Sequence, residues 1–217
     1  MTRETAPTSQ GTSPSFFPYV DDSFKEIYAF YAKDTVGIRV QVMSGIVFLL
    51  YLWFVAGFLE LTRVAGRSRI LNRATGWAAV CCVLLTLMTY VFWALPVFWL
   101  NDDAVHTSLV VLVYYVAVAV YLFLFLCLAL FMTGSGLLVL RTGVLPRWLG
   151  VSALVVAVPN AAVFSLFFVT SGPLRPVSLL MFTTQVLVCG WVAVTGIHMV
   201  RYSPENLSPA AVETGAR

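Results

Sequence analysis

The stretch Ser108–Leu130 reads SLVVLVYYVAVAVYLFLFLCLAL and contains no charged residue. A bilayer core is about 30 Å thick and a helix rises about 1.5 Å per residue, so about 20 apolar residues make one crossing. The sequence therefore predicts an all-α protein, a transmembrane bundle of five helices within residues 41–200. The four other stretches of comparable length and hydropathy are Gln41–Leu61, Gly76–Leu100, Trp148–Thr170 and Val177–Val200.

The composition of the chain is that of a membrane protein. Of its 217 residues, 60% are apolar and 11% are charged, and the mean hydropathy is +0.89. Soluble domains are about 45–50% apolar and about 25% charged. The net charge is only +3, and the basic residues lie at predicted helix ends rather than along a nucleic-acid-binding stripe. We therefore expect one membrane domain, with membrane lipids and no nucleic acid as partners.

The third apolar run continues beyond Leu130, through Gly134, Ser135 and Gly136 to Leu140. A run of this length is too long for one perpendicular crossing. We expect the helix to tilt or to project into the cytoplasm, because tilting is a usual response to excess length.

Arginines in the connecting loops predict the orientation. Lys and Arg are retained on the cytoplasmic side of a membrane. The first and third loops hold six arginines, whereas the second loop holds Asp102 and Asp103 and the fourth loop holds Arg175 as its one charged residue. We therefore expect a multi-pass plasma-membrane protein with the amino terminus outside and residues 201–217 as a cytoplasmic tail. The six loop arginines placed inside are Arg63, Arg67, Arg69, Arg73, Arg141 and Arg147.

Two segments precede the first crossing. Residues 1–20 are rich in Ser, Thr and Pro, which predicts a disordered tail. The first 35 residues contain no apolar run of signal-peptide length, so no cleavage is expected. In residues 21–35, Ser23 and Glu26 have the spacing of a capping box. We expect a short amphipathic helix at the outer membrane surface, and a solvated extension of the first crossing is the alternative. The apolar face of the predicted amphipathic helix consists of Phe24, Ile27, Tyr28 and Tyr31.

The residues that most often hold metals or cofactors form no complete site. Asp102, Asp103 and His106 are too few to fill a metal shell, and acidic residues at a helix start complement the helix dipole. No Gly-rich phosphate loop, Ser-His-Asp order or haem-type histidine pair occurs. We expect no cofactor, metal or disulfide, since buried cysteine usually acts as a small hydrophobe. The four cysteines all lie in apolar stretches, at Cys81, Cys82, Cys127 and Cys189.

Two amides and four aromatic residues have a similar predicted depth in the outward half of the bundle. Amides in hydrocarbon are costly unless protein or water satisfies them. The six residues therefore either line one ligand pocket or form interhelical hydrogen bonds, each worth about 0.6–2 kcal/mol. These candidate pocket residues are Tyr90, Trp93, Tyr114, Tyr115, Asn160 and Gln185.

Two stretches carry a family resemblance. One is EIYAFY at Glu26–Tyr31, followed by Asp34 and Ile38–Arg39, and the other is LPRWLG at Leu145–Gly150, followed by Gly172–Pro173. Together they resemble a family of uncharacterised actinobacterial multi-pass integral membrane proteins. Members of that family often begin with an additional hydrophobic helix, where this chain has its Ser/Thr/Pro-rich tail. The resemblance implies a membrane bundle, and it implies no reaction and no catalytic residue.

Two functions are compatible with these features. The first is a non-enzymatic membrane protein that holds a lipid-like or other apolar ligand, or a partner's helix, in the outward half of the bundle. The alternative is a small membrane-embedded enzyme, of cyclase or isomerase type, acting on an isoprenoid or sterol-like substrate. Aromatic rings stabilise a developing cation, and Asp102 or Asp103 would act as the general acid. Such an acid needs a raised pKa and hence burial.

Overall fold

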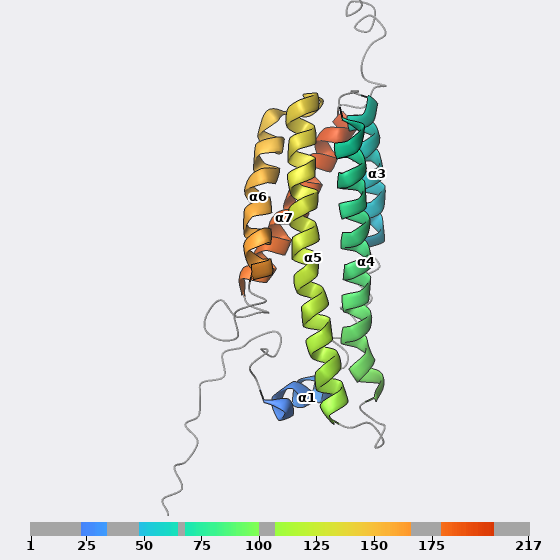
Figure 1. Ribbon diagram of the computed structural model, residues 1–217, viewed down its shortest axis with the longest axis vertical. Helices are drawn as coiled ribbons and strands as arrows, with labels where there is room; N and C mark the ends of the chain where they lie inside the picture. Colours follow the sequence, from blue (N-terminus) through green and yellow to red (C-terminus); the bar gives the residue numbers. More distant parts are fainter. Residues whose placement is uncertain (1–22, 34–47, 65–67, 100–106, 166–178, 202–217) are drawn as a thin grey trace, which may run out of the picture.

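The computed structural model describes residues 23–33, 48–64, 68–99, 107–165 and 179–201. In these ranges the chain is helical apart from residues 23, 68 and 143–146, and the predicted bundle of five helices with a short amino-terminal helix is confirmed. The five bundle helices run alternately in opposite directions, and the short helix lies across the end of the two longest ones (Figure 1). The elements are α1 (Phe24–Lys33), α3 (Phe48–Val64), α4 (Arg69–Trp99), α5 (Thr107–Thr142), α6 (Arg147–Ser165) and α7 (Leu179–Arg201).

Four of these helices, α4 to α7, are long and apolar enough to cross a bilayer, which indicates a membrane-embedded protein. α3 has 17 described residues. Residues 41–47 of its predicted crossing lie outside the described residues, as do residues 1–20 and 202–217.

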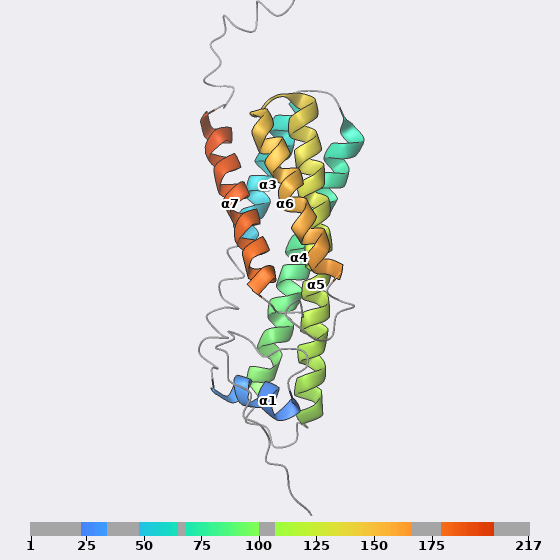
Figure 2. The ribbon, with the colours of Figure 1, turned by 90° about the vertical axis from the view of Figure 1, so that its left-hand side faces the viewer.

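α4 and α5 pack side by side and are longer than their predicted crossings. α5 has 36 residues, which corresponds to about 54 Å, well above the bilayer core. The apolar run past Leu130 therefore belongs to one continuous helix that ends at Thr142. At the opposite end, α4 and α5 extend past the described parts of α3, α6 and α7 (Figures 1 and 2).

α5 lies between α4 and α6, and glycines allow its backbone to approach both helices. A Cβ atom on Gly136 would lie 2.8 Å from the carbonyl oxygen of Gly150 in α6. A Cβ atom on Gly134 would collide with the side chain of Thr75 in α4. Small residues at helix crossings are a usual means of close packing in membranes, so the GSG sequence fixes where α5 meets both neighbours.

Aromatic rings from three helices meet around Trp191 of α7. Its ring centroid lies 6.3 Å from that of Phe54 and 6.2 Å from that of Phe58 in α3, and 6.4 Å from that of Phe131 in α5. The indole Nε1–H also donates a 3.0 Å hydrogen bond to the carbonyl of Leu149 in α6. One buried side chain thus joins four helices.

The predicted capping box forms at the start of α1. The backbone N–H and the hydroxyl of Ser23 each donate a 2.8 Å hydrogen bond to Glu26 Oε2, and the Glu26 N–H donates to Ser23 Oγ at 3.4 Å. The backbone bond, followed by the hydroxyl bond, lowers the pKa of the Glu26 carboxyl below its ordinary value of 4.5.

The buried face of α1 packs on the α4–α5 hairpin. Ile27 and Tyr31 are buried, and the ring of Tyr31 meets that of Tyr114 in α5 edge to face, with 6.5 Å between centroids. Burial raises the pKa of the Tyr31 phenol. α1 and α3 point in different directions (Figure 1), so α1 is a docked helix of its own.

The alternation of helix directions gathers arginines at one end of the bundle, which we call the arginine end. α3, α5 and α7 end there, whereas α4 and α6 begin there. All arginines among the described residues lie at or near this end: Arg63, Arg69, Arg73, Arg141, Arg147 and Arg201.

Candidate functional site: a groove between α3 and α4

A groove of about 940 Å³ runs between α3 and α4 from the arginine end towards the middle of the bundle. We call it the arginine groove. Its volume lies at the upper end of the roughly 300–1,000 Å³ typical of small-molecule sites. Its lining residues from α3 are Leu52, Val55, Ala56, Leu59, Thr62 and Arg63, and those from α4 and its cap are Ser68, Arg69, Asn72, Arg73, Gly76, Trp77 and Val80.

In the described part of the chain, three guanidinium groups lie at the rim of the groove. Arg63 comes from the last turn of α3, whereas Arg69 and Arg73 come from the first turns of α4. Arg63 also pairs with Glu60, with Nη1 3.4 Å from Oε2, and both side chains are largely exposed. Glu60 balances the charge of only one of the three arginines, so the rim keeps a surplus of positive charge. The exposed pair itself contributes little to stability.

Asn72 holds the two walls together just below the rim. Its Nδ2 donates a 3.0 Å hydrogen bond to the carbonyl of Leu59 in α3, and its Oδ1 accepts a 3.3 Å bond from the hydroxyl of Thr62. Thr62 is buried. These bonds fix the distance between α3 and α4 at the arginine end, and they occupy the side-chain polar groups that would otherwise face the groove.

The start of α4 is formed by a serine cap. Ser68 Oγ accepts a 3.3 Å bond from the N–H of Leu71, and the Ser68 carbonyl accepts a 3.0 Å bond from the N–H of Asn72. Serine favours this position because its side chain satisfies an otherwise unpaired N–H of the first turn. The positive end of the α4 dipole therefore lies at the rim beside Arg69.

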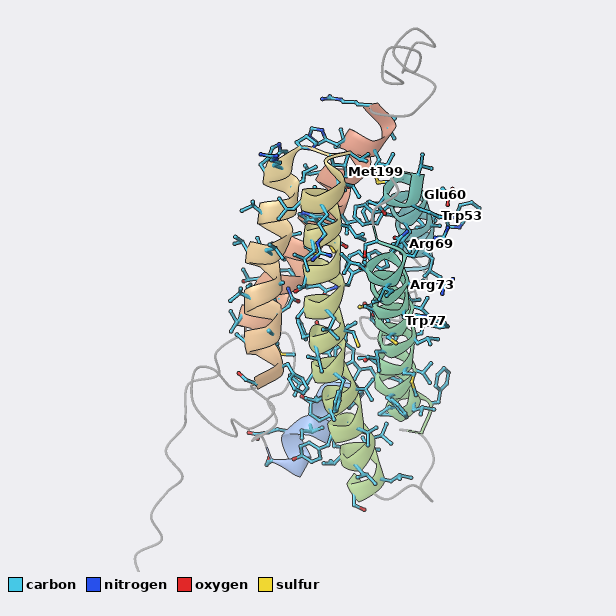
Figure 3. All side chains as sticks on the ribbon, turned by 45° about the horizontal axis from the view of Figure 1, so that its top comes forward. Trp53, Glu60, Arg69, Arg73, Trp77 and Met199 are labelled. Atoms are coloured by element: carbon cyan, nitrogen blue, oxygen red, sulfur yellow. The ribbon has the colours of Figure 1, made fainter. Side chains whose placement is uncertain are left out.

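The remainder of the groove is apolar. Arg69, Arg73 and Trp77 follow one another along α4 at one-turn intervals, and Figure 3 shows them on the same side of the bundle as Trp53 and Glu60 of α3. Trp77 is 71% exposed. Beyond it the walls are formed by Leu52, Val55, Ala56 and Val80.

The groove, with its rim included, has about the length of one membrane leaflet. Val80 lies eleven residues along α4 from Arg69, and Leu52 lies eleven residues along α3 from Arg63. Both spacings correspond to about 16 Å along a helix axis, half the thickness of a bilayer core. The groove therefore spans about one leaflet, with a cationic end and an apolar remainder.

The structure separates the predicted pocket residues into groups. Tyr90 and Trp93 of α4 are ring partners at 6.2 Å, and Trp93 also contacts Tyr121 of α5 at 5.3 Å. Tyr114 and Tyr115 are partners at 5.9 Å, at the end of α5 that carries α1. None of these four side chains lines the arginine groove.

Asn160 lies at a different level from the α5 tyrosines. Phe164 of α6 meets Phe123 of α5 at 5.5 Å, which sets the register of these antiparallel helices. From that contact Asn160 lies towards the arginine end and Tyr115 away from it, about 18 Å apart along the axes. Counting along crossings of about 20 residues predicts equal depth for these residues. α5 has 36 residues, so a residue near its start lies farther from the middle of the bundle than that count assumes.

The two predicted amides are inside the bundle. Asn160 is fully buried, its Nδ2 donates a 2.8 Å bond to the carbonyl of Val156, and its Oδ1 has no hydrogen-bond partner among the described residues. Gln185 is half-buried, with its Oε1 likewise unpartnered within the described part of the chain. A single pocket that joins the amides to all four aromatic residues stays a prediction.

The candidate acids of the enzyme hypothesis, Asp102 and Asp103, lie outside the described residues, as does His106. Among the residues that are described, no group of three or more His, Cys, Asp or Glu side chains could hold a metal ion.

The arginine groove was not predicted from the sequence, where its arginines served only as orientation signals. A signal was present nonetheless. Arg69, Arg73 and Trp77 share one face of a helix because they are spaced at i, i+4 and i+8. The opposing wall could not be inferred, because the register of α3 against α4 depends on the Asn72 bonds.

Comparison of the chain with protein-family models, with curated proteins and with solved structures found no match. The resemblance to an actinobacterial membrane-protein family therefore stays a prediction, and the candidate site rests on its geometry.

Proposed function

We propose that the protein binds a lipid-like ligand in the arginine groove, with the polar end of the ligand at the rim and its apolar part along the walls. The observation that carries this proposal is the polarity of the groove, which is about 16 Å long, with three arginines of the described residues at one end and apolar side chains along the rest. Basic pockets between transmembrane helices are typical binding sites for lipid head groups. The ligand thus lies at the arginine end, and the prediction of a site in the outward half is not carried further.

We further propose that the arginine end faces the cytoplasm of a plasma-membrane protein. All arginines of the described residues lie at or near this end, and retention of positive residues on the cytoplasmic side then places α1 outside. The rim would face the leaflet whose surface potential is negative, about −30 mV. The groove is therefore open to the leaflet that supplies lipids with anionic head groups.

A blocking variant tests lipid binding. Ala56 is an exposed residue of α3 that lines the groove, so Ala56→Phe should fill the apolar body. We expect the purified wild-type protein to retain a lipid through extensive detergent washing, as observed by native mass spectrometry, and the variant to lose it.

The matched control is Ala161→Phe, which adds the same ring at an exposed position of α6 outside the groove. This variant should retain the lipid. Equal lipid retention by both variants would show that the bound molecules cover the bundle nonspecifically, and the proposal would be wrong. The enzyme alternative is not advanced, since no observation on the described residues favours it.

A further inference from the structure

We infer that the arginine groove selects a phospholipid of net negative charge and holds its phosphate between Arg63 of α3 and the pair Arg69 and Arg73 of α4. This inference rests on the proposed function, since it specifies the head group of the lipid-like ligand. It commits to a membrane lipid from the leaflet at the arginine end, because the apolar body of the groove requires a chain as well as a phosphate.

The side chains of the rim suit a phosphate group. A guanidinium keeps its charge at all relevant pH values, and its planar set of donors matches phosphate oxygens in pairs. The three groups come from two helices that face each other across the groove. The first turn of α4 adds the positive end of its dipole at the same place.

The lining residues also disfavour a zwitterionic head group. Among the described residues that line the groove, none is acidic, so the ammonium of a zwitterionic lipid would meet like charge there without a carboxylate partner. Glu60 lies near the rim, but its Oε2 is already 3.4 Å from Arg63 Nη1. The rim therefore distinguishes lipids by charge, attracting the phosphate and repelling the ammonium.

Asn72 and Thr62 act as positioning residues. The Asn72 amide donates to the Leu59 carbonyl, and the single proton of the Thr62 hydroxyl is shared between the Phe58 carbonyl and Asn72 Oδ1. These contacts hold Arg63 opposite the first turns of α4. Selection by charge thus depends on a fixed distance between the two walls and not only on the number of arginines.

The test measures head-group preference in mixed lipid. Wild-type protein is equilibrated with equal amounts of phosphatidylglycerol and phosphatidylcholine of the same chains, and the retained lipid is identified by native mass spectrometry. We expect enrichment of the anionic lipid. Arg69→Gln with Arg73→Gln should reduce this enrichment about thirtyfold, the equivalent of about 1 kcal/mol for each arginine, while total lipid in the groove is retained.

The matched control is Arg141→Gln with Arg147→Gln, which removes the same charge at the same end of the bundle but outside the groove. Its enrichment should equal that of the wild type. If both double variants lose the preference equally, the surface charge of the whole end is responsible, and the inference is overturned.

Two further arms separate the remaining outcomes. Glycerol phosphate, which lacks chains, should not displace the lipid at millimolar concentration, and displacement would overturn a lipid-specific site. Lipid retention that depends on Ala56 but shows no head-group preference would overturn this inference and leave the proposed function standing. Equal lipid retention by the wild type and Ala56→Phe would refute the proposed function itself.

Discussion

The indole N–H of Trp191 donates a 3.0 Å hydrogen bond to the carbonyl of Leu149, and this bond links α7 to α6 at the point where α3 and α5 also reach the tryptophan ring. α7 packs chiefly on α6 and makes little contact with the rest of the bundle. The bond therefore anchors α7, which also lies beside the groove wall, because the side chain of Met199 in α7 reaches Gly57 of α3.

Trp191→Phe should destabilise the protein by about 1–2 kcal/mol. The phenyl ring retains most of the aromatic packing but leaves the Leu149 carbonyl without its indole donor, and a bond of this kind is worth roughly 0.6–1.7 kcal/mol in a membrane bundle. The free energy of unfolding in mixed detergent micelles measures the effect. Trp53→Phe is the control, because Trp53 is 81% exposed, and its change should stay within about 0.5 kcal/mol. Equal losses for both variants would contradict an anchoring role.

Gly136→Ala should destabilise the bundle by about 1–3 kcal/mol. The new methyl group would lie 2.8 Å from the Gly150 carbonyl oxygen and 2.9 Å from Leu154 Cγ. Since the first contact is with backbone, α5 and α6 would have to move apart. Thermal unfolding in detergent measures the loss.

Gly190→Ala is the matched control, a Gly-to-Ala change inside α7 that should stabilise the protein and not destabilise it. A Cβ atom there meets no atom within 4 Å, so the gain in helix propensity should stabilise the protein by up to about 1 kcal/mol. Destabilisation by both substitutions would show that the loss at Gly136 does not come from the α5–α6 crossing.

The five bundle helices were predictable because each apolar run is long enough to cross a membrane. The predicted start Trp148 lies one residue after the observed start of α6, and the predicted end Val200 one residue before the end of α7. The length of α5 was also predictable, since Arg141 is the first charged residue to interrupt an apolar run that passes through two glycines. The start of α4 was less predictable, because its first turns carry Arg69 and Arg73 before the apolar run that begins at Gly76.

The arrangement of the helices could not be read from the sequence in the same way. Helices that are apolar on every side show no face that must turn inward, so the contacts of Trp191 and Gly136 are visible only in the structure. The candidate site could not be read from the sequence for the same reason. Its arginines were noticed as charges at a membrane end, whereas the groove between them depends on how α3 packs against α4.

The helix α1 should lose protection in acid because of its cap. The carboxylate form of Glu26 accepts two hydrogen bonds from Ser23, which lowers its pKa below 4.5. Its contribution is therefore fully present above pH 4.5 and is lost as the pH falls through the lowered pKa. Hydrogen-exchange protection of α1, corrected for intrinsic rates, should decrease below that pH.

Two variants check the cap. Glu26→Gln should give protection that no longer depends on pH in this range, and Ser23→Ala should cost about 1 kcal/mol of local helix stability at neutral pH. Exchange as fast as in an unstructured peptide at neutral pH in the wild type would mean that α1 does not form.

The proposed orientation predicts which end of the bundle is accessible from outside the cell. Ser68 lies at the arginine end, before α4, and the exposed Ser108 lies at the opposite end, in the first turn of α5. In a background with the four native cysteines replaced by serine or alanine, Ser108→Cys should react with a membrane-impermeant maleimide in intact cells. Ser68→Cys should react only after the membrane is opened, because moving Arg63, Arg69 and Arg73 across the membrane is disfavoured. Labelling of position 68 with position 108 protected would invert the orientation. It would also place the arginine groove in the outer leaflet, away from the anionic lipids of the cytoplasmic face.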